Sequence, residues 1–151
     1  MDDKSAPATW ATQRLDALIR KEVEPPLVIQ TLRLWTLDEW EPGWAKKTWH
    51  PQPDLLNVDG SLFGGYIAAL ADQIMAFAAM TVLPGDMSMR TLNLSLTFLR
   101  VGKAEPVIVL GKVRSQTKQI IATSAELSRP DGTLIAEATA QQILQPYRPP
   151  Q

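Results

Sequence analysis

The sequence contains no cysteine and only one histidine, His50, among its 151 residues. The missing thiols exclude disulfide bonds, cysteine nucleophiles and thiolate metal sites, so a metal ion would have to rely on carboxylates alone. The chain has 15 basic and 16 acidic residues, a formal net charge of -1, and its basic residues are scattered. A nucleic-acid-binding protein would show a concentrated basic surface instead. We therefore expect no metal, no organic cofactor and no nucleic-acid partner.

The sequence also lacks the pattern of a signal peptide and that of a convincing membrane span. No basic stretch followed by an apolar run occurs at Met1–Lys4, so we expect a cytoplasmic protein. The most apolar segment is Phe63–Leu83, and its single charged residue, Asp72, is followed directly by Gln73. These two polar side chains would be costly at the centre of a lipid bilayer. We therefore expect a buried helix here and no membrane partner.

The N-terminal part of the chain predicts a short amphipathic helix over residues 9–23, which ends at Pro25-Pro26. Residues 27–37 alternate loosely between apolar and polar side chains, which predicts a strand that residues 44–49 continue. The last residues are rich in proline and predict a disordered tail. The expected organisation is a leader helix at 1–26, one domain at 27–145 and a tail at 146–151.

The centre of the chain predicts a long helix that ends at Pro84-Gly85 and is apolar on every face. Four β-rich runs follow, at 87–100, 107–115, 120–128 and 133–144, and their short connections predict an antiparallel meander. A helix that is apolar all round must be covered all round. We therefore expect an α+β fold in which the sheet wraps one side of the helix and another subunit covers the rest, which makes the protein a homo-oligomer.

One stretch carries a family resemblance. Residues 57–72 read Asn-Val-Asp-Gly-Ser-Leu-Phe-Gly-Gly-Tyr-Ile-Ala-Ala-Leu-Ala-Asp. They resemble the signature of PaaI-type hotdog thioesterases, in which an asparagine precedes His-Gly-Gly at a helix start and a carboxylate follows within the helix. The similarity extends to residues 91–100 and 127–138. The resemblance implies a hotdog fold, an antiparallel sheet wrapped around a long central helix, and acyl-CoA hydrolysis by a homodimer or homotetramer with sites between subunits.

The residue types in this stretch suit thioester hydrolysis. Backbone N–H groups at Gly64 and Gly65 lie at a helix start, where the helix dipole favours a developing oxyanion. Asp72 is the only charged residue between Asp59 and Asp86, and a buried carboxylate has either a partner or a catalytic role. It would act as a general base or as a nucleophile. The alternatives are glycines that merely permit close packing, and an aspartate that is only a structural hydrogen-bond acceptor.

The spacing of these residues predicts a site shared by two subunits. Gly64 and Asp72 are eight residues apart, which is roughly 12 Å along one helix. One carbonyl carbon cannot contact both ends of such a span. If both groups serve one thioester, the oxyanion donor comes from one subunit and Asp72 from the other.

The other candidate residues have weaker signals. Asn57 matches the family asparagine that holds the thioester carbonyl or leaving group, although it could be an ordinary turn residue. Thr91 lies near the position where relatives carry a serine or threonine that positions water, although threonine is common in any strand. Phe63 replaces the family histidine, and an apolar ring there would shape the acyl pocket. Arg100 is our candidate for the phosphates of the acyl-CoA substrate.

A hotdog hydratase and a non-catalytic hotdog protein are the two alternatives to a thioesterase. A hotdog hydratase would need an Asp-x-Asn-Pro-x-His context, and His50 lies in no such pattern. A non-catalytic acyl-CoA or lipid-binding hotdog protein is the stronger alternative, because Phe63 departs from the catalytic signature.

Overall fold

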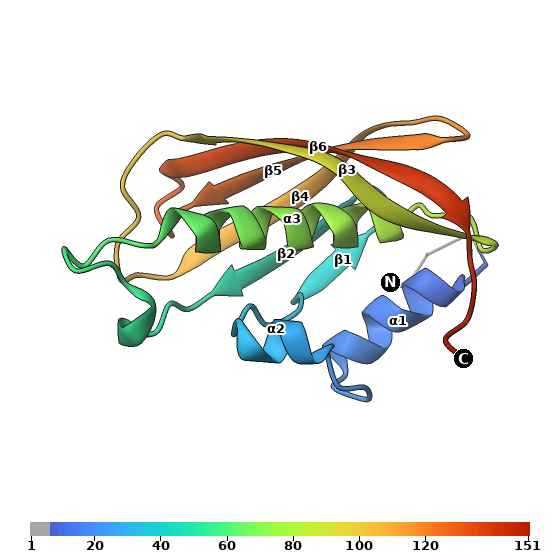
Figure 1. Cartoon of the computed structure of the whole chain (residues 1–151), viewed down its shortest axis with the longest axis horizontal. Helices are drawn as coiled ribbons and strands as arrows, with labels where there is room; N and C mark the ends of the chain where they lie inside the picture. The colour runs from blue at the N-terminus through green and yellow to red at the C-terminus, as the bar shows by residue number, and fades with distance from the viewer. Residues whose placement is uncertain (1–6) are drawn as a thin grey trace.

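The computed structural model describes residues 7–151, and its main features are one curved sheet and one long helix (Figure 1). The elements occur in an order close to the expected one. They are α1 (Trp10–Ile19), α2 (Leu27–Thr31), β1 (Glu39–Glu41), β2 (Trp44–Trp49), the 3-10 turn η1 (Pro53–Leu55), α3 (Gly64–Met80), β3 (Met87–Phe98), β4 (Val107–Gln116), β5 (Ile120–Ser128) and β6 (Leu134–Pro146).

The sheet has six strands in the order β1-β2-β4-β5-β6-β3, and every neighbouring pair is antiparallel. The four β-rich runs predicted after the helix are confirmed as β3 to β6. The predicted meander is wrong at its first step, because β3 pairs with β6, with Leu94 opposite Ala140, and not with β4. Residues 99–106 cross the end of the sheet instead of forming a hairpin. This crossover is held by a hydrogen bond from the Leu62 N–H to the Gly102 carbonyl, at 2.9 Å.

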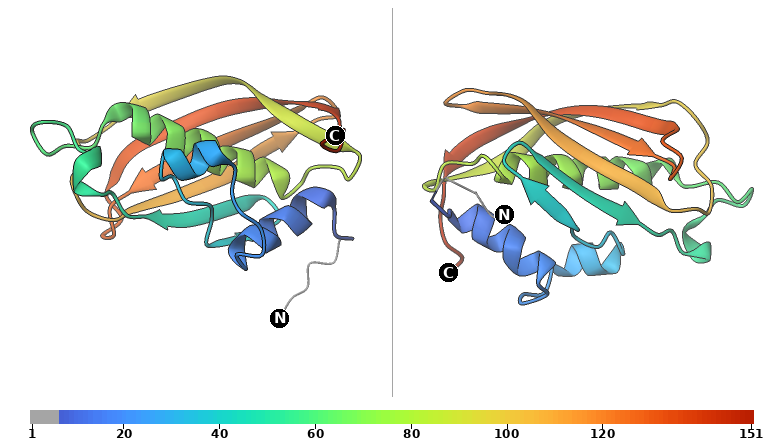
Figure 2. Two further views of the ribbon diagram at one scale, coloured as in Figure 1. Left: turned by 60° about the horizontal axis from the view of Figure 1, so that its bottom comes forward. Right: turned by 180° about the vertical axis from the view of Figure 1, so that it is seen from behind.

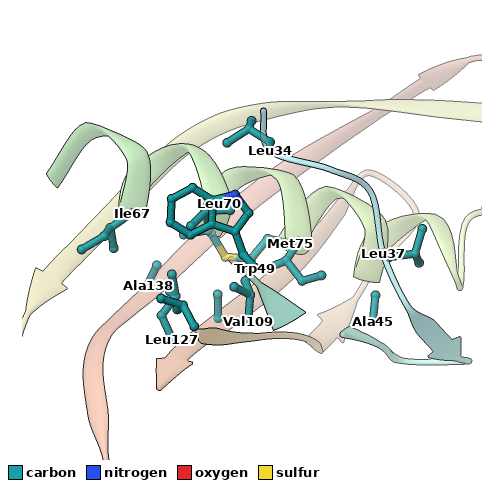
Figure 3. Packing of buried hydrophobic residues seen from close by; sticks show 14 of the residues in the cluster. Leu34, Leu37, Ala45, Trp49, Ile67, Leu70, Met75, Val109, Leu127 and Ala138 are labelled. Atoms are coloured by element: carbon teal, nitrogen blue, oxygen red, sulfur yellow. The ribbon is translucent and has the colours of Figure 1, made fainter. Parts of the chain in front are cut away.

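Helix α3 packs against the concave face of the sheet, as Figure 3 shows for its buried side chains. Leu70 and Ile74 are completely buried, and Val109 of β4 and Leu127 of β5 are buried in the same core. Each such side chain contributes about 1.5–3 kcal/mol through removal from water. The closest approach is at Gly111 of β4, where a Cβ would lie 2.5 Å from the carbonyl oxygen of Ile74. The sheet thus covers one side of α3, as the apolar pattern predicted.

The strand predicted over residues 27–37 is wrong. Leu27–Thr31 instead form the short helix α2, with Pro26 at its N-cap, and Arg33 and Trp35 adopt left-handed φ angles of 52° and 60°. The carbonyl groups of this loop are bonded by core side chains rather than by a neighbouring strand. Trp49 Nε1 donates to the Arg33 carbonyl at 2.9 Å. Two residues with positive φ interrupt any ladder of backbone hydrogen bonds, which explains the failure of the prediction.

The predicted leader helix is confirmed as α1, although it ends at Ile19 rather than at Val23. Helices α1 and α2 lie beside the edge of the sheet that is formed by β1 and β2 (Figure 2). Trp10 of α1 stacks on Tyr147, with ring centroids 4.3 Å apart. The sequence predicts a disordered tail from residue 146, but Pro146 belongs to β6 and Tyr147 is packed on the body of the fold. No helix within residues 7–151 is long and apolar enough to cross a membrane.

Candidate active site

Asp72 and Thr91, which the sequence marks separately, lie side by side. Asp72 is half-buried in the middle of α3, and the Thr91 hydroxyl donates to its Oδ1 atom at 3.1 Å. Thr91 lies where the pairing of β3 with β6 shifts register, between Thr91 and Asn93. Such β-bulges redirect side chains and are common beside active sites. Here the bulge accompanies a hydroxyl held against a carboxylate.

The start of α3 presents two backbone donors without a partner. Phe63 is the N-cap residue and supplies no side-chain cap, while its carbonyl accepts from the Tyr66 N–H at 3.0 Å. The N–H groups of Gly64 and Gly65 have no acceptor within residues 7–151. Unpaired N–H groups at the positive end of a helix dipole can bind an oxyanion.

Two aromatic rings flank these glycines. The Phe98 ring lies over Gly64, where a Cβ would come within 3.0 Å of its Cζ atom. The Phe63 ring folds over Gly65 and would overlap a Cβ at that position. Each ring remains more than half exposed, at 55% for Phe63 and 56% for Phe98. The glycines therefore permit the close packing of these two rings, and the role of their N–H groups as oxyanion donors stays a prediction.

Asn57 stabilises the loop that leads into α3. Its Nδ2 atom donates to the Ser61 Oγ at 3.0 Å and to the Leu62 carbonyl at 3.3 Å. Ser61 also bonds Asp59 through its hydroxyl and its backbone N–H, and these bonds lower the pKa of the Asp59 carboxyl. Asn57 thus performs the turn role that the sequence leaves open as an alternative. Its Oδ1 atom accepts no hydrogen bond from the described residues.

Arg100 lies just beyond the end of β3, where the strand passes the start of α3. Its Nη1 atom donates to the Leu134 carbonyl at 2.8 Å, and the side chain is exposed. Phe98 was not among the predicted site residues, although Leu94, Leu96 and Phe98 alternate along the strand. That alternation signals a face directed toward the helix.

The candidate residues therefore form two groups along one helix. Asp72 and Thr91 form the first group, which we call the carboxylate end. Around the helix start lies the second group, the oxyanion end, formed by Asn57, Phe63, Gly64, Gly65, Phe98 and Arg100. The two ends are separated by roughly 12 Å of helix rise, from Gly64 to Asp72. Within residues 7–151 no three His, Asp or Glu side chains gather in a way that could hold a metal ion.

Strand β3 lies beside both ends, and no other strand of residues 7–151 pairs with its outer edge. β3 has 12 residues and is the last strand of the sheet, and Arg90 is its only charged residue. Leu94 and Phe98 share the face of buried Ala140 and Ala136, yet they are 38% and 56% exposed. Long apolar edge strands are usually covered in the functional assembly.

Comparisons with known proteins agree on the architecture. A family model described as the thioesterase superfamily matches residues 59–136. A phenylacetic acid degradation-related protein of Ralstonia eutropha JMP134 is 27% identical, with a TM-score of 0.76 over 85% of this chain and 98% of that chain. No curated protein matches the sequence.

Two of the similar solved structures contain coenzyme A or its acetyl thioester. A hypothetical thioesterase of Streptococcus pneumoniae TIGR4 with coenzyme A is 21% identical, with a TM-score of 0.68 over 75% of this chain and 87% of that chain. The protein smu.793 of Streptococcus mutans UA159, bound to acetyl-CoA, is 22% identical, with a TM-score of 0.68 over 76% and 90%. The six-stranded antiparallel sheet around a central helix is the expected hotdog fold, and these likenesses confirm it.

Proposed function

Because the chain belongs to the thioesterase superfamily, we propose that it is an acyl-CoA thioesterase, which hydrolyses an acyl-CoA to a carboxylic acid and free coenzyme A. The observation that carries this proposal is the hydrogen bond between Thr91 and Asp72 on the partly open side of α3. A carboxylate with a hydroxyl neighbour is equipped to bind a water molecule between them. The likenesses to proteins that contain coenzyme A support the substrate class.

In the proposed reaction, Asp72 takes a proton from a water molecule that the Thr91 hydroxyl orients. The water oxygen then forms a bond to the thioester carbonyl carbon, the C–S bond breaks, and the proton passes to the departing thiolate. A direct attack by the Asp72 carboxylate is the second route. It would break the C–S bond, release the coenzyme A thiolate and form an acyl anhydride, which water then hydrolyses to the carboxylic acid and free Asp72.

The carbonyl oxygen gains negative charge during either route, and the helix start would stabilise it. The N–H groups of Gly64 and Gly65 are the proposed donors. Losing one donor of this kind typically costs about 100-fold to 1,000-fold in rate. Asn57 would add a contact to the carbonyl or the leaving group by donating from Nδ2, after it releases its bonds to Ser61 and Leu62.

We propose that the complete site forms between two subunits of a homodimer or of a dimer of dimers. The carboxylate end and the oxyanion end are too far apart on one helix to contact the same carbonyl. The exposed edge of β3 and the partly open face of α3, with Gly65, Ala69, Asp72 and Ala76, are where the second subunit would lie. Its helix start would then face Asp72.

The acyl and nucleotide parts of the substrate have candidate contacts. The exposed rings of Phe63 and Phe98 would form an apolar wall for the acyl group next to the oxyanion donors. Arg100, close to the same end, would pair with a phosphate of coenzyme A.

A non-catalytic acyl-CoA-binding protein is the second candidate function. It is favoured by Phe63, which stands where relatives carry a histidine, and by the Asn57 amide group, which is engaged in its own loop.

Thiol release from a panel of acyl-CoAs tests the proposal. We expect turnover by the wild type and a fall in kcat of about 100-fold or more in Asp72→Asn, because the base is removed while the shape is kept. Asp86→Asn, an exposed aspartate after α3, is the matched control and should keep full activity. Acyl-CoA binding by calorimetry without turnover in the wild type would reject hydrolysis in favour of the binding protein.

A further inference from the structure

A cavity lies away from the candidate active site, between the N-terminal segment and β2. Its volume is about 780 Å³, and none of the candidate active-site residues lines it. This volume is in the range of small-molecule binding sites. Its apolar lining comes from Leu18 and Ile19 of α1, Ile29 of α2, and Val23 and Trp35 in the adjoining loops.

The same cavity is lined by a buried lysine. Burial alternates along β2, and Lys47 takes its place between Ala45 and Trp49 on the face that points into the core. Only 2% of Lys47 is exposed. Its Nζ atom donates to the Leu34 carbonyl at 2.7 Å and to Oε1 of Gln73.

Both hydrogen-bond acceptors of Lys47 are neutral, so neither of them balances its charge. An ammonium group has three N–H donors, and the third has no acceptor within residues 7–151. No carboxylate of these residues lies within 4.0 Å of Nζ. Desolvation lowers the pKa of Lys47 to about 7, and the more distant Asp38 carboxylate only partly opposes this.

The two bonds alone do not explain a lysine at this position. Gln73 already bonds the loop through its Nε2 atom, which donates to the Trp35 carbonyl at 2.7 Å. A neutral donor would hold the Leu34 carbonyl without the cost of burying a charge. A cation next to an apolar cavity instead complements an anion that brings an apolar chain with it.

The remaining charged groups of the cavity are engaged or lie at its rim. Arg33 forms an ion pair at 3.0 Å with Asp54, which does not line the cavity. The Asp38 carboxylate accepts a hydrogen bond from the Thr48 N–H at 2.7 Å. The other charged or titratable lining residues are exposed: Lys21, Glu24 and His50. Lys47 is therefore the most buried cation among the residues that line the cavity.

We propose that this cavity is a binding site for an amphipathic carboxylic acid, whose carboxylate pairs with Lys47 while its apolar chain lies against Leu18, Ile29 and Trp35. The site does not depend on the proposed hydrolase activity, and it would accept either a fatty acid or an aryl-alkyl acid. Chain-length preference among such acids then follows from the length of the apolar lining.

Calorimetric titration of the full-length protein at pH 6 with decanoate, below its micellar concentration, tests the site. The uncharged decanamide is the matched ligand, and we expect it to bind at least about tenfold more weakly because it cannot pair with Lys47. Lys47→Met should weaken decanoate binding to a similar extent. The control is Lys46→Met, because Lys46 points to the opposite face of β2 and pairs with Glu39 at 3.5 Å.

Binding should also depend on pH, because only the charged form of Lys47 attracts the anion. With a pKa of about 7 in the free protein, the dissociation constant of decanoate should rise about tenfold between pH 6 and pH 8. Histidines in general change charge in this range, so the same series is run on His50→Gln. The rise should persist in that variant and disappear in Lys47→Met.

Equal binding of decanoate and decanamide by the wild type, or no binding of decanoate at millimolar concentration, overturns the proposal. So does wild-type affinity in Lys47→Met. If Lys47→Met does not fold, the comparison of decanoate with decanamide and the pH series on His50→Gln still test whether the carboxylate pairs with Lys47.

Discussion

Asp72 and Thr91 form the smallest unit on which the proposed chemistry depends. Asp72 lies on a helix and Thr91 on an edge strand, 19 positions apart in the sequence, and one hydrogen bond of 3.1 Å joins them. A carboxylate that accepts a hydroxyl hydrogen bond is held in one orientation. The hydroxyl oxygen can in turn accept a bond from water, which gives Thr91 a positioning role rather than that of a base.

The role of Thr91 is tested by two substitutions that differ in the hydroxyl group. Thr91→Val keeps the shape and removes the hydroxyl, so kcat should fall about tenfold, as for the loss of one hydrogen bond to a charged group. Thr91→Ser keeps the hydroxyl and should restore most of the rate, with KM little changed in both variants. Equal rates for the valine and serine variants would show that the hydroxyl has no part in turnover.

At the level of single residues, the sequence indicated candidate side chains but not the residues that contact them. Asp72 was conspicuous because no other charge occurs in its apolar helix, and Gly64 because of its place at the helix start. Their contacts were not predictable, since the Phe98 ring over Gly64 depends on how β3 passes α3. Lys47 was missed, although it alternates with Ala45 and Trp49, and a period of two predicts that all three point inward.

Helix α3 carries both ends of the proposed site, so its first turn can be tested separately from Asp72. Gly64 is the first helical residue, and proline is well tolerated at that position because its missing N–H has no intrahelical partner. Phe63, with φ -65° and ψ 127°, already has the extended conformation that a following proline requires.

Gly64→Pro should therefore keep the fold and lower kcat by about 100-fold, because one proposed oxyanion donor is lost. Gly64→Ala is the matched control, since its Cβ meets the same Phe98 ring while its N–H remains. A comparable loss of kcat in both variants would assign the effect to the ring contact and remove Gly64 from the oxyanion hole.

The positions of most helices and strands were predictable from the sequence. The pairing of the strands within the sheet was not. Runs of β-branched and apolar residues marked β3 to β6 to within a few positions, because alternation reflects the two faces of a strand. The pairing of β3 with β6 follows from the long connection at residues 99–106, whose path no local pattern encodes. The strand predicted over residues 27–37 was wrong because a loose alternation of apolar and polar residues is also compatible with a short helix. Here that helix is followed by Arg33 and Trp35 with positive φ angles.

At the scale of the whole molecule, the two edges of the sheet differ in length. One edge of the sheet ends in the three-residue strand β1, while the other ends in the 12-residue strand β3. β1 is short, whereas β3 has an outer edge with which no strand of residues 7–151 pairs, and it exposes Leu94 and Phe98. This asymmetry is the structural basis for placing the second subunit at β3.

Leu94→Lys tests this interface. A charge buried against the second subunit should weaken self-association by about 100-fold or more, and activity should fall with the dimer population. Sedimentation velocity over a concentration series measures the association. Leu27→Lys introduces the same charge on α2, at a side chain that is 78% exposed, and should leave both properties unchanged. A Leu94→Lys monomer with full activity would contradict a site between subunits.

The most direct test of the two-subunit site is complementation between two inactive variants. Asp72→Asn and Gly64→Pro are mixed in equal amounts, allowed to exchange subunits, and assayed for thiol release from the best acyl-CoA. Half of the dimers are then mixed, and each of these has one site with both an intact helix start and an intact Asp72. The mixture should recover about a quarter of the wild-type rate. Subunit exchange without any recovery would contradict the account, because it would place both catalytic groups of each site in the same chain.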